Sequence, residues 1–184
     1  MSEIQPSLRV PISEERIHQD GGFVNRVAIT VGVTGTRYRE KITPGQTRRL
    51  GVLLRKVYDL YYLDGEVWLA HGDCVGWDEV CHDVAKEIGY KIRIFPPSND
   101  VHRANCNGNF YEVPQLYSIR NHDIVRASDY IIGGPKSDAE QVRSGTWATI
   151  RYARKQKKPY TIIYPNGRME GRNWELILKP AALS

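Results

Sequence analysis

Short runs of apolar, mostly β-branched residues alternate along the chain with longer stretches whose apolar residues recur every three or four positions. The short runs are typical of buried strands, and the longer stretches are typical of amphipathic helices. The runs predict strands at residues 27–33, 67–70, 91–95, 129–132 and 160–164. The longer stretches predict helices at about residues 44–61, 77–87, 116–127 and 144–156.

The alternation of these strands and helices predicts the fold class. Consecutive strands that are joined by helices pair in parallel through right-handed crossovers. We therefore expect an α/β, Rossmann-like open sheet that is mainly parallel, has five strands or more, and carries helices on both faces. Residues 1–26 show no clear period and are expected to form an irregular extension, so that residues 27–184 make up a single domain. Two polar segments, 98–115 and 133–143, are expected to be loops.

The composition narrows the class of protein. The chain has 184 residues, of which 41% are hydrophobic and 26% charged, as in a soluble globular protein. Its longest apolar run is too short to cross a membrane, and its first residues do not resemble a signal peptide. The three cysteines are odd in number and form no CxxC pair, which suits a reducing compartment. We expect a cytoplasmic protein with no membrane partner.

The chain contains enough histidines and cysteines to supply the ligands of a zinc site. They are His71, Cys74, Cys81, His82, His102, Cys106 and His122. The chain has no CxxC or HxxxH pair among them, and paired spacings of this kind are the usual sign of zinc ligands. Residues of the core or the surface are the better explanation, so we expect no metal and no cofactor.

The positive charge of the chain is concentrated in one place. The net charge is +5, and the segment 151–158 alone carries five basic residues and no acid. This segment lies at the carboxyl end of the last predicted helix, where cations stabilise the helix dipole. Nucleic-acid binding stays open as a hypothesis, but the charge does not favour it.

The loops that follow the strands are the places to look for a ligand site, because open α/β sheets bind ligands at the carboxyl ends of their strands. Glycines, hydroxyls and arginines gather in these loops and at the helix starts. The candidate ligand-binding residues are Gly35, Thr36, Arg37, His71, Gly72, Gly76, Asp78, Arg120, Asn121, Ser144, Gly145 and Thr146. Taken singly, each group also fits a plain turn or a solvated helix face.

Each candidate has an expected role. Arg37 and Arg120 would neutralise a phosphate, and the free N–H groups of the helix that begins near Ser144 would bind an anion. Asp78 would either cap its helix or accept a hydrogen bond from a ribose hydroxyl. The aromatic rings beside the loops would stack on a base or simply pack in the core. These rings are Tyr38, Trp77, Tyr117 and Trp147.

Four motifs in order carry a resemblance to a known family. They are Val33-Thr34-Gly35-Thr36-Arg37, His71-Gly72-Asp73-Cys74-Val75-Gly76-Trp77-Asp78, Arg120-Asn121 and Ser144-Gly145-Thr146. Over about residues 27–165 the chain resembles the SLOG superfamily of Rossmann-like nucleotide-binding domains, in particular its YspA-like branch. The resemblance implies a nucleotide-type ligand with its phosphate near the glycine and threonine loops. Relatives include LOG-type phosphoribohydrolases, receptors of nucleotide signals in defence systems, and the DNA-processing protein A branch.

The sequence departs from the hydrolase pattern at the catalytic position. LOG-type enzymes use a glutamate three residues after the Gly-Thr pair, and that position is Thr149 here. A threonine cannot supply the carboxylate that the reaction needs. Asp73, Asp78 and Glu79 remain catalytic candidates, because they belong to or follow the loop after the second strand. The Gly133-Gly134 pair is also separated from Gly-Thr by an insertion, which would suit a larger ligand.

Three functions follow as hypotheses. The first is binding of a nucleotide or nucleotide-derived signalling molecule, without catalysis, as a sensor or sponge in defence or anti-defence, a role that would also suit a phage protein. The second is hydrolysis of an N-glycosidic bond in a nucleoside phosphate or an ADP-ribose-like compound. The third is binding of single-stranded DNA. We also expect the chain to form a homo-oligomer.

Overall fold

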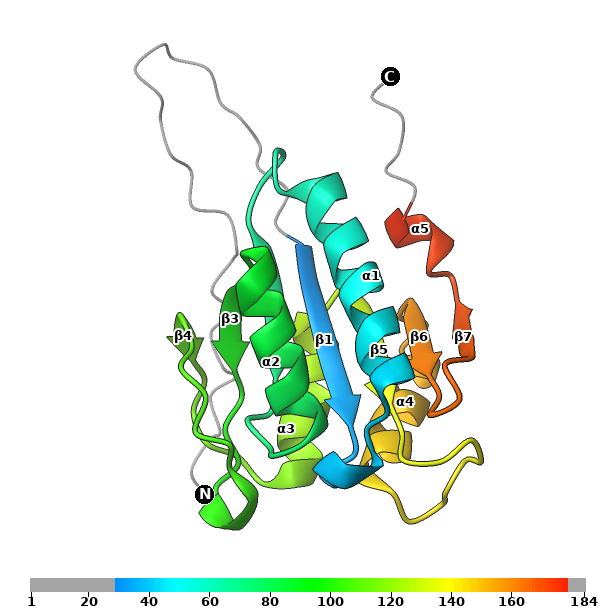
Figure 1. The fold of residues 1–184 in the computed structure, drawn as a ribbon. Helices are drawn as coiled ribbons and strands as arrows, with labels where there is room; N and C mark the ends of the chain where they lie inside the picture. Colours follow the sequence, from blue (N-terminus) through cyan, green and yellow to red (C-terminus); the bar gives the residue numbers. More distant parts are fainter. Residues whose placement is uncertain (1–28, 179–184) are drawn as a thin grey trace.

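A single twisted sheet forms the centre of the computed structural model, which describes residues 29–178. Its strands are β1 (Ile29–Gly35), β2 (Val67–His71), β3 (Lys91–Ile94), β4 (Phe110–Tyr111), β5 (Tyr130–Gly134), β6 (Tyr160–Ile163) and β7 (Met169–Arg172). The seven strands lie in the order β4-β3-β2-β1-β5-β6-β7. Every neighbouring pair is parallel except β6 and β7, which are antiparallel (Figure 1). The fold is therefore the Rossmann-like α/β sheet that the sequence predicts.

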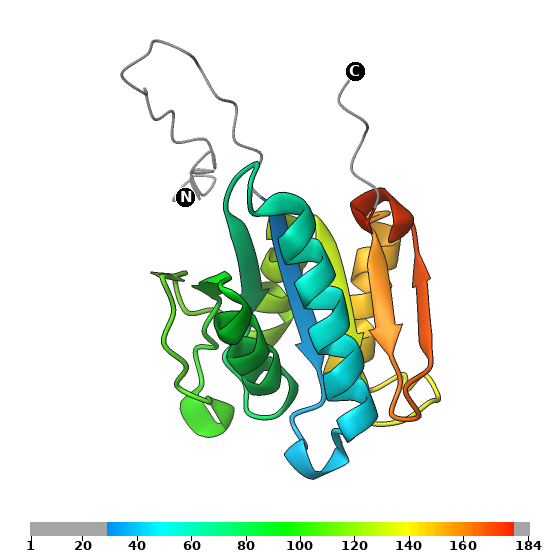
Figure 2. The same cartoon turned by 45° about the horizontal axis from the view of Figure 1, so that its top comes forward.

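Helices cover both faces of this sheet. They are α1 (Pro44–Tyr61), α2 (Trp77–Ile88), α3 (Tyr117–Ala127), α4 (Gly145–Lys155) and the short α5 (Glu175–Leu178). Helices α1 and α2 pack side by side on one face, and α3 and α4 do so on the other (Figure 1). The turned view shows α1 running along β1, and α5 lies near the carboxyl end of α1 (Figure 2). None of the helices in the described part of the chain is long and apolar enough to cross a membrane.

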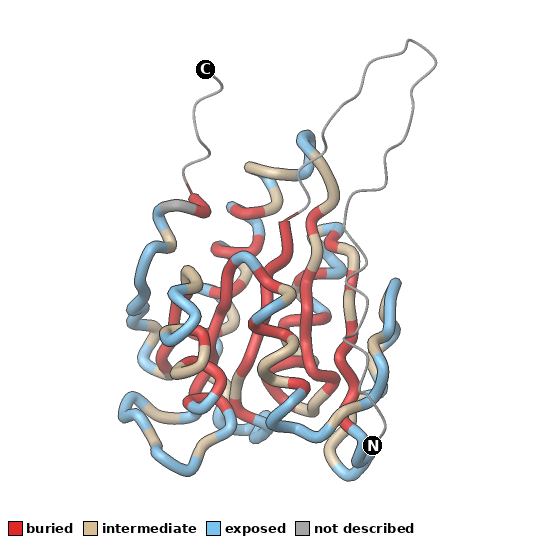
Figure 3. Tube along the Cα trace, turned by 180° about the vertical axis from the view of Figure 1, so that it is seen from behind, coloured by how far each residue is buried: buried red, intermediate tan, exposed pale blue. Residues whose placement is uncertain are grey.

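The core fills the space between the sheet and each helix layer. Val31 and Leu69 of the sheet and Leu54 of α1 belong to the core on one face, and all three are completely buried. On the opposite face, Ile131 of β5 belongs to a second core cluster with Ile150 of α4. The central strands are buried along their length, whereas exposed residues gather in the loops (Figure 3). Strands that are buried on both faces explain the nearly continuous apolar runs of the sequence.

The local sequence signals explain where the helices begin and end. Helix α1 begins at a capping box in which the Thr43 hydroxyl accepts from the Gln46 N–H, and the Gln46 side chain accepts from the Thr43 N–H. Helix α2 ends at Gly89, which has a φ of 115°. That left-handed conformation favours glycine.

The structure does not describe the beginning of the chain. The predictions that fall there concern the extension 1–26, its boundary with the domain, and residues 27 and 28 of the first predicted strand.

Several predicted boundaries need correction. Strand β5 continues to Gly134, so the second polar loop begins two residues later than predicted, and β6 ends at Ile163. The segment 98–115 is not all loop, because it contains a short 3-10 helix and β4.

Two elements near the carboxyl end were not predicted. Strand β7 is exposed at every position and carries no apolar alternation, and α5 has only four residues. Backbone pairing with β6, after a turn at Gly167, holds β7 at the edge of the sheet. Its existence therefore depends on tertiary pairing rather than on its own residue pattern.

The strand order reverses between β1 and β5. From β1 the chain proceeds through β2 and β3 to β4, and it then crosses back to β5 on the other side of β1. The loops that follow β1 and β5 consequently start side by side, and the Thr36 N–H donates to the Gly134 carbonyl over 2.9 Å. Open α/β sheets form their ligand crevices at such a reversal.

Candidate functional site

A cavity of about 310 Å³ opens at the carboxyl ends of β1 and β5. Its walls come from the loop after β1, the loop after β2 with the start of α2, helix α3, the loop after β5 and the start of α4. The predicted residues that line it are Gly35, Thr36, Arg37, Asp78, Arg120, Asn121, Ser144, Gly145 and Thr146. The fold thus brings together residues that lie more than a hundred positions apart in the sequence.

The glycines after β2 do not face this cavity. Gly76 has a φ of 89°, and a Cβ atom there would lie 2.6 Å from the Thr36 carbonyl oxygen. That same carbonyl accepts the first N–H group of α2, from Trp77, over 2.9 Å. The space that we predicted for a ligand is therefore filled by the Thr36 and Arg37 backbone at Gly76 and by the Arg120 side chain at Gly72.

Gly35 and Gly134 make room for a tryptophan ring of the protein itself. A Cβ atom on either glycine would lie within 2.1 or 2.2 Å, respectively, of the indole ring of Trp77. The two glycines belong to neighbouring strands, so together they leave a flat surface on which this completely buried ring packs. Trp77 does not line the cavity. The aromatic residues that do are Trp147 of α4 and, on the other walls, Tyr38 and Tyr117.

Arg120 is a buried cation in the wall of the cavity. Its side chain is only 5% exposed, and Nη2 donates to the Cys74 sulfur over 3.2 Å. Nη1 lies 3.8 Å from Oδ2 of Asp78, and the guanidinium also lies over the ring of Tyr117. Nε has no hydrogen-bond partner among residues 29–178. The guanidinium is therefore held in place, although not all of its N–H groups have an acceptor in the described part of the chain.

Asp78 holds the loop that supports Arg120. Its Oδ2 accepts hydrogen bonds from the backbone N–H groups of Gly72 and Cys74, over 3.0 and 3.3 Å. Burial raises the pKa of this carboxyl, while the nearby Arg120 charge and the two backbone bonds act in the opposite direction. Asp78 is the one carboxylate among the described residues that line the cavity.

The other two catalytic candidates are engaged elsewhere. Asp73 is completely buried and accepts from the Arg103 side chain and the Cys106 backbone, over 2.7 and 2.8 Å. It thereby fastens the long 98–115 segment to the loop after β2. Glu79 forms an ion pair with Arg39 at 2.7 Å and accepts from the Gly76 N–H over 3.4 Å at the start of α2. Neither Asp73 nor Glu79 lines the cavity.

The start of α4 forms another wall of the cavity. Ser144 caps the helix, with its hydroxyl accepting from the Trp147 N–H over 3.4 Å, and Gly145 has open space around its Cα. Thr149, at the position of the LOG-type glutamate, also lines the cavity, but its hydroxyl donates to the Gly145 carbonyl over 2.9 Å. The wall consequently offers backbone N–H groups and no carboxylate.

The loop after β5 contributes lining residues that were not among our candidates. Lys136, Gln141 and Arg143 come from this loop, at the insertion that separates the two glycine motifs. The sequence signal was the insertion itself, but irregular loops have no periodicity that would tell which side chains face inward. With Arg37 and Arg120, the lining contains four cations against one carboxylate.

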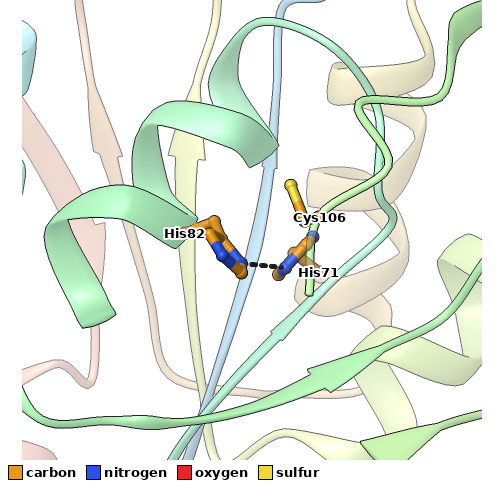
Figure 4. Close-up of side chains that lie close together, drawn as sticks. All are labelled: His71, His82 and Cys106. Atoms are coloured by element: carbon orange, nitrogen blue, oxygen red, sulfur yellow. Dashed lines mark hydrogen bonds between the residues drawn. The ribbon is translucent and has the colours of Figure 1, made fainter. Parts of the chain in front are cut away.

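Three metal-ligating side chains do meet elsewhere, between β2 and α2. His71, His82 and Cys106 bring one ligand atom each to within 4.8 Å of one another (Figure 4). His71, which we predicted beside the ligand, is completely buried and does not line the cavity, and burial lowers its pKa to about 3. Its ring is therefore neutral, with one N–H group and one lone pair.

The hydrogen bonds of His71 decide against a metal ion. Its Nδ1 accepts from the Asp73 N–H over 3.0 Å, so the proton belongs on Nε2, which lies 3.1 Å from Nδ1 of His82. A metal at Nε2 would require the proton on Nδ1, where it would face another donor. The donor set does not fit a metal, and the histidines form a hydrogen-bonded pair.

Comparison with solved structures supports the fold assignment. The chain is similar to a molybdenum cofactor binding protein from Rippkaea orientalis, with a TM-score of 0.55 and 23% identity over 74% of this chain and 76% of that one. The molybdenum cofactor carrier protein of Chlamydomonas reinhardtii gives a TM-score of 0.53 and 17% identity, over 74% and 76% of the two chains. DNA processing protein A from Streptococcus pneumoniae gives 0.53 and 17%, over 73% of this chain and 50% of that one.

These matches establish the fold. DNA processing protein A represents a branch of the SLOG superfamily, so the fold implied by the sequence resemblance is confirmed. A scan against protein-family models gives no match, and neither does a search of curated proteins.

Proposed function

We propose that the protein binds a nucleotide or a nucleotide-derived molecule in the cavity at the carboxyl ends of β1 and β5. The state of Arg120 is the observation that supports this most strongly. A charged side chain that is 95% buried normally has its donors satisfied, because an unpaired buried donor is costly. Here Nε has no partner within the described part of the chain, and Nη2 has only a sulfur atom. An anionic group in the cavity would balance the charge of this guanidinium and offer it a stronger acceptor than the sulfur atom.

The surroundings of Arg120 support an anion as well. The first turn of α4 offers backbone N–H groups and the positive end of a helix dipole, beside Ser144, Gly145 and Thr146. The remaining cations of the lining face the same space, and only one carboxylate opposes them. A phosphate is the common biological anion that fits such a set of donors.

Two aromatic rings favour a nucleotide over a simple phosphate. Tyr38 and Tyr117 line the cavity and are 43% and 37% exposed. An exposed aromatic ring can stack on a base, which is worth about 1–3 kcal/mol in nucleic-acid systems. The cavity, at about 310 Å³, lies at the lower end of the usual range for small-molecule sites, roughly 300–1,000 Å³.

Hydrolysis of an N-glycosidic bond is the second candidate. Asp78 lines the cavity, and a buried carboxyl with a raised pKa can act as a general acid. Its Oδ2 is already bonded to two backbone N–H groups, however, and glycoside hydrolysis normally uses two carboxyls. No second carboxylate lines the cavity in the described part of the chain. Binding without turnover is therefore our first proposal.

Calorimetric titration tests this proposal. The panel contains AMP, GMP, ADP-ribose, a cyclic dinucleotide and the molybdenum cofactor after which two structural neighbours are named. We expect at least one compound to bind, and Arg120→Gln to weaken its binding at least about tenfold, the loss of one charge-assisted contact. Arg126→Gln is the matched control, because Arg126 lies on the same helix, is 57% exposed and pairs with Asp123.

The outcomes separate the candidates. Failure of every compound to bind the wild-type protein, or full binding by a folded Arg120→Gln variant, contradicts the proposal. Release of free base that is lost in Asp78→Asn favours the hydrolase instead. Retention of single-stranded DNA that weakens steeply with salt favours the third hypothesis.

The biological use of the ligand stays a prediction of the sequence resemblance. A sensor or sponge in defence would need to bind its signal without destroying it, which agrees with Thr149 at the glutamate position. The expected homo-oligomer is likewise a proposal, and light scattering on the purified protein measures it directly.

A further inference from the structure

The loop between β5 and Ser144, called here the 135–143 loop, directs its cations into the cavity. Lys136 and Arg143 both line the cavity. Neither forms an ion pair with another residue in the described range 29–178. Their charges are therefore available to a ligand.

The acids of the same loop are bound elsewhere. Glu140 accepts from Arg151 at 2.9 Å and from Arg154 at 3.0 Å, both on the outer side of α4. Asp138 accepts from Asn166 over 2.9 Å, in the turn between β6 and β7. Part of the basic 151–158 segment thus neutralises Glu140 and holds the 135–143 loop in place.

Further contacts fasten both ends of the loop. The Gln46 side chain donates to the Pro135 carbonyl over 2.9 Å, and Arg151 donates to the Val142 carbonyl over 3.0 Å. Figure 2 shows the loop in yellow, reaching toward the turn that precedes β7. An anchored loop can present Lys136 to the cavity at lower entropic cost than a loose one.

The cations of the cavity fall into two groups. Arg120 is buried in the wall. At the rim, Lys136 Nζ lies 5.0 Å and Arg37 Cζ lies 5.5 Å from the centre of the same ring, that of Tyr38. The Arg37 hydrogen bond and the two charges lower the pKa of the Tyr38 hydroxyl, which reflects the positive potential at the rim. One phosphate at Arg120 and the α4 start would leave the rim cations unused.

We infer that the ligand is a nucleotide with a diphosphate group, whose second phosphate contacts Lys136 and Arg37 at the rim. This inference rests on the proposed nucleotide-binding function and specifies its substrate class. Glu140 is a positioning residue in this scheme, because it holds the 135–143 loop without lining the cavity.

Paired titrations test the inference. The dissociation constants of AMP and ADP, and of the corresponding pairs for guanosine, cytidine and uridine, are measured on the full-length protein at low salt. We expect the diphosphate of the preferred nucleoside to bind at least about tenfold more tightly than its monophosphate, since a charge-assisted contact is worth about that much. In Lys136→Gln the diphosphate should lose most of this advantage, so that the ratio of the monophosphate to the diphosphate dissociation constant falls toward one.

Lys155→Gln is the matched control. It removes the same charge from an exposed position in the last turn of α4, away from the cavity lining. Its ratio of monophosphate to diphosphate dissociation constants should equal that of the wild type. An equal drop in both lysine variants would mean that only the overall charge matters, and it would overturn the inference.

The positioning role of Glu140 has its own readout. Glu140→Gln should reduce the diphosphate advantage about threefold at low salt, in line with the modest strength of exposed ion pairs, and leave monophosphate binding unchanged. A residue that only stabilised the fold would weaken both ligands together.

The remaining outcomes distinguish this inference from the proposed function. Equal binding of monophosphate and diphosphate by the wild type overturns the inference alone. Failure of every nucleotide to bind overturns the proposed function and the inference with it.

Discussion

Arg120 packs so closely against Gly72 that a Cβ atom on the glycine would lie 1.1 Å from Nη1 of the guanidinium. Gly72 is thus needed for the position of a side chain 48 residues away, although it does not line the cavity itself. The Gly72 N–H in turn donates to Asp78, so the loop, the carboxylate and the guanidinium form one unit.

Gly72→Ala should therefore displace Arg120 and weaken ligand binding at least about tenfold, the same loss that we expect of Arg120→Gln. Calorimetry against the ligand found for the wild type measures this loss. Gly51→Ala is the control, because Gly51 lies within α1 and its nearest neighbour to an added Cβ is at 3.9 Å. That substitution should stabilise the protein by about 0.5–1 kcal/mol. Unchanged ligand affinity in Gly72→Ala would contradict the packing argument.

Gly134→Ala should destabilise the protein by about 1–3 kcal/mol, because an added methyl group would overlap the buried ring of Trp77. Urea unfolding followed by tryptophan fluorescence measures the change. Combining it with Trp77→Leu should recover part of the loss, since the smaller side chain leaves room for the methyl group. Full additivity of the two substitutions would show that the ring and the glycine are not coupled.

Gln46 joins α1 to two other elements from a completely buried position. Its side-chain amide donates to the carbonyls of Pro135 and Ile163, each over 2.9 Å. Gln46→Ala should reduce the free energy of unfolding by about 2–4 kcal/mol, because both carbonyls would lose their donor. Arg48→Ala, at an exposed position of the same helix, should change it by less than about 0.5 kcal/mol. A similar small effect of both substitutions would show that the carbonyls find other partners.

The stability of the protein should fall with acidity because of His71. Its pKa is lowered to about 3 in the folded protein, mainly by burial, whereas the unfolded chain has an ordinary value near 6.5. Below that ordinary value the unfolded state binds a proton that the folded state does not, so unfolding becomes more favourable as the pH falls toward about 3. This group alone contributes a slope of at most about 1.4 kcal/mol per pH unit.

Urea unfolding at pH 7 and pH 5 compares the wild type with His71→Gln. We expect the wild type to lose more stability between the two values than the variant, by about 2 kcal/mol. His122→Gln removes a histidine on α3 that is partly exposed, and it should keep the pH dependence of the wild type. Equal pH dependence in all three proteins would mean that His71 does not titrate as the burial of its ring indicates.

The buried elements of the fold could be predicted because their residue patterns are local. The run from Ile29 and the cap at Thr43 describe a strand and a helix start without reference to any other segment. Strands β4 and β7 could not be predicted in this way. Both are exposed, and each exists because a neighbouring strand offers its backbone N–H and carbonyl groups.

The residues of the candidate site likewise include some that local sequence signals predicted and others that they could not. The residues of the loop after β1 and the start of α4 were predicted because a glycine, a hydroxyl or an arginine at the end of a strand or the start of a helix is a local signal. Lys136 and Arg143 were missed, because nothing in a loop sequence separates a cation that faces a cavity from one that faces solvent. His71 was predicted at the site but does not line the cavity, because its position at the end of β2 does not determine which side its ring faces.

The sequence by itself therefore determined the order of the buried strands and helices, and with it the edge of the sheet at which a cavity would form. Hydrophobic periodicity and capping act between near neighbours, so they can be read without the fold. Only the tertiary structure decided what occupies each space at that edge. Trp77 fills the room beside Gly35, Arg120 fills the room beside Gly72, and the loop after β5 turns its cations inward. These contacts join residues that are far apart in the chain, and close packing leaves each space to one occupant.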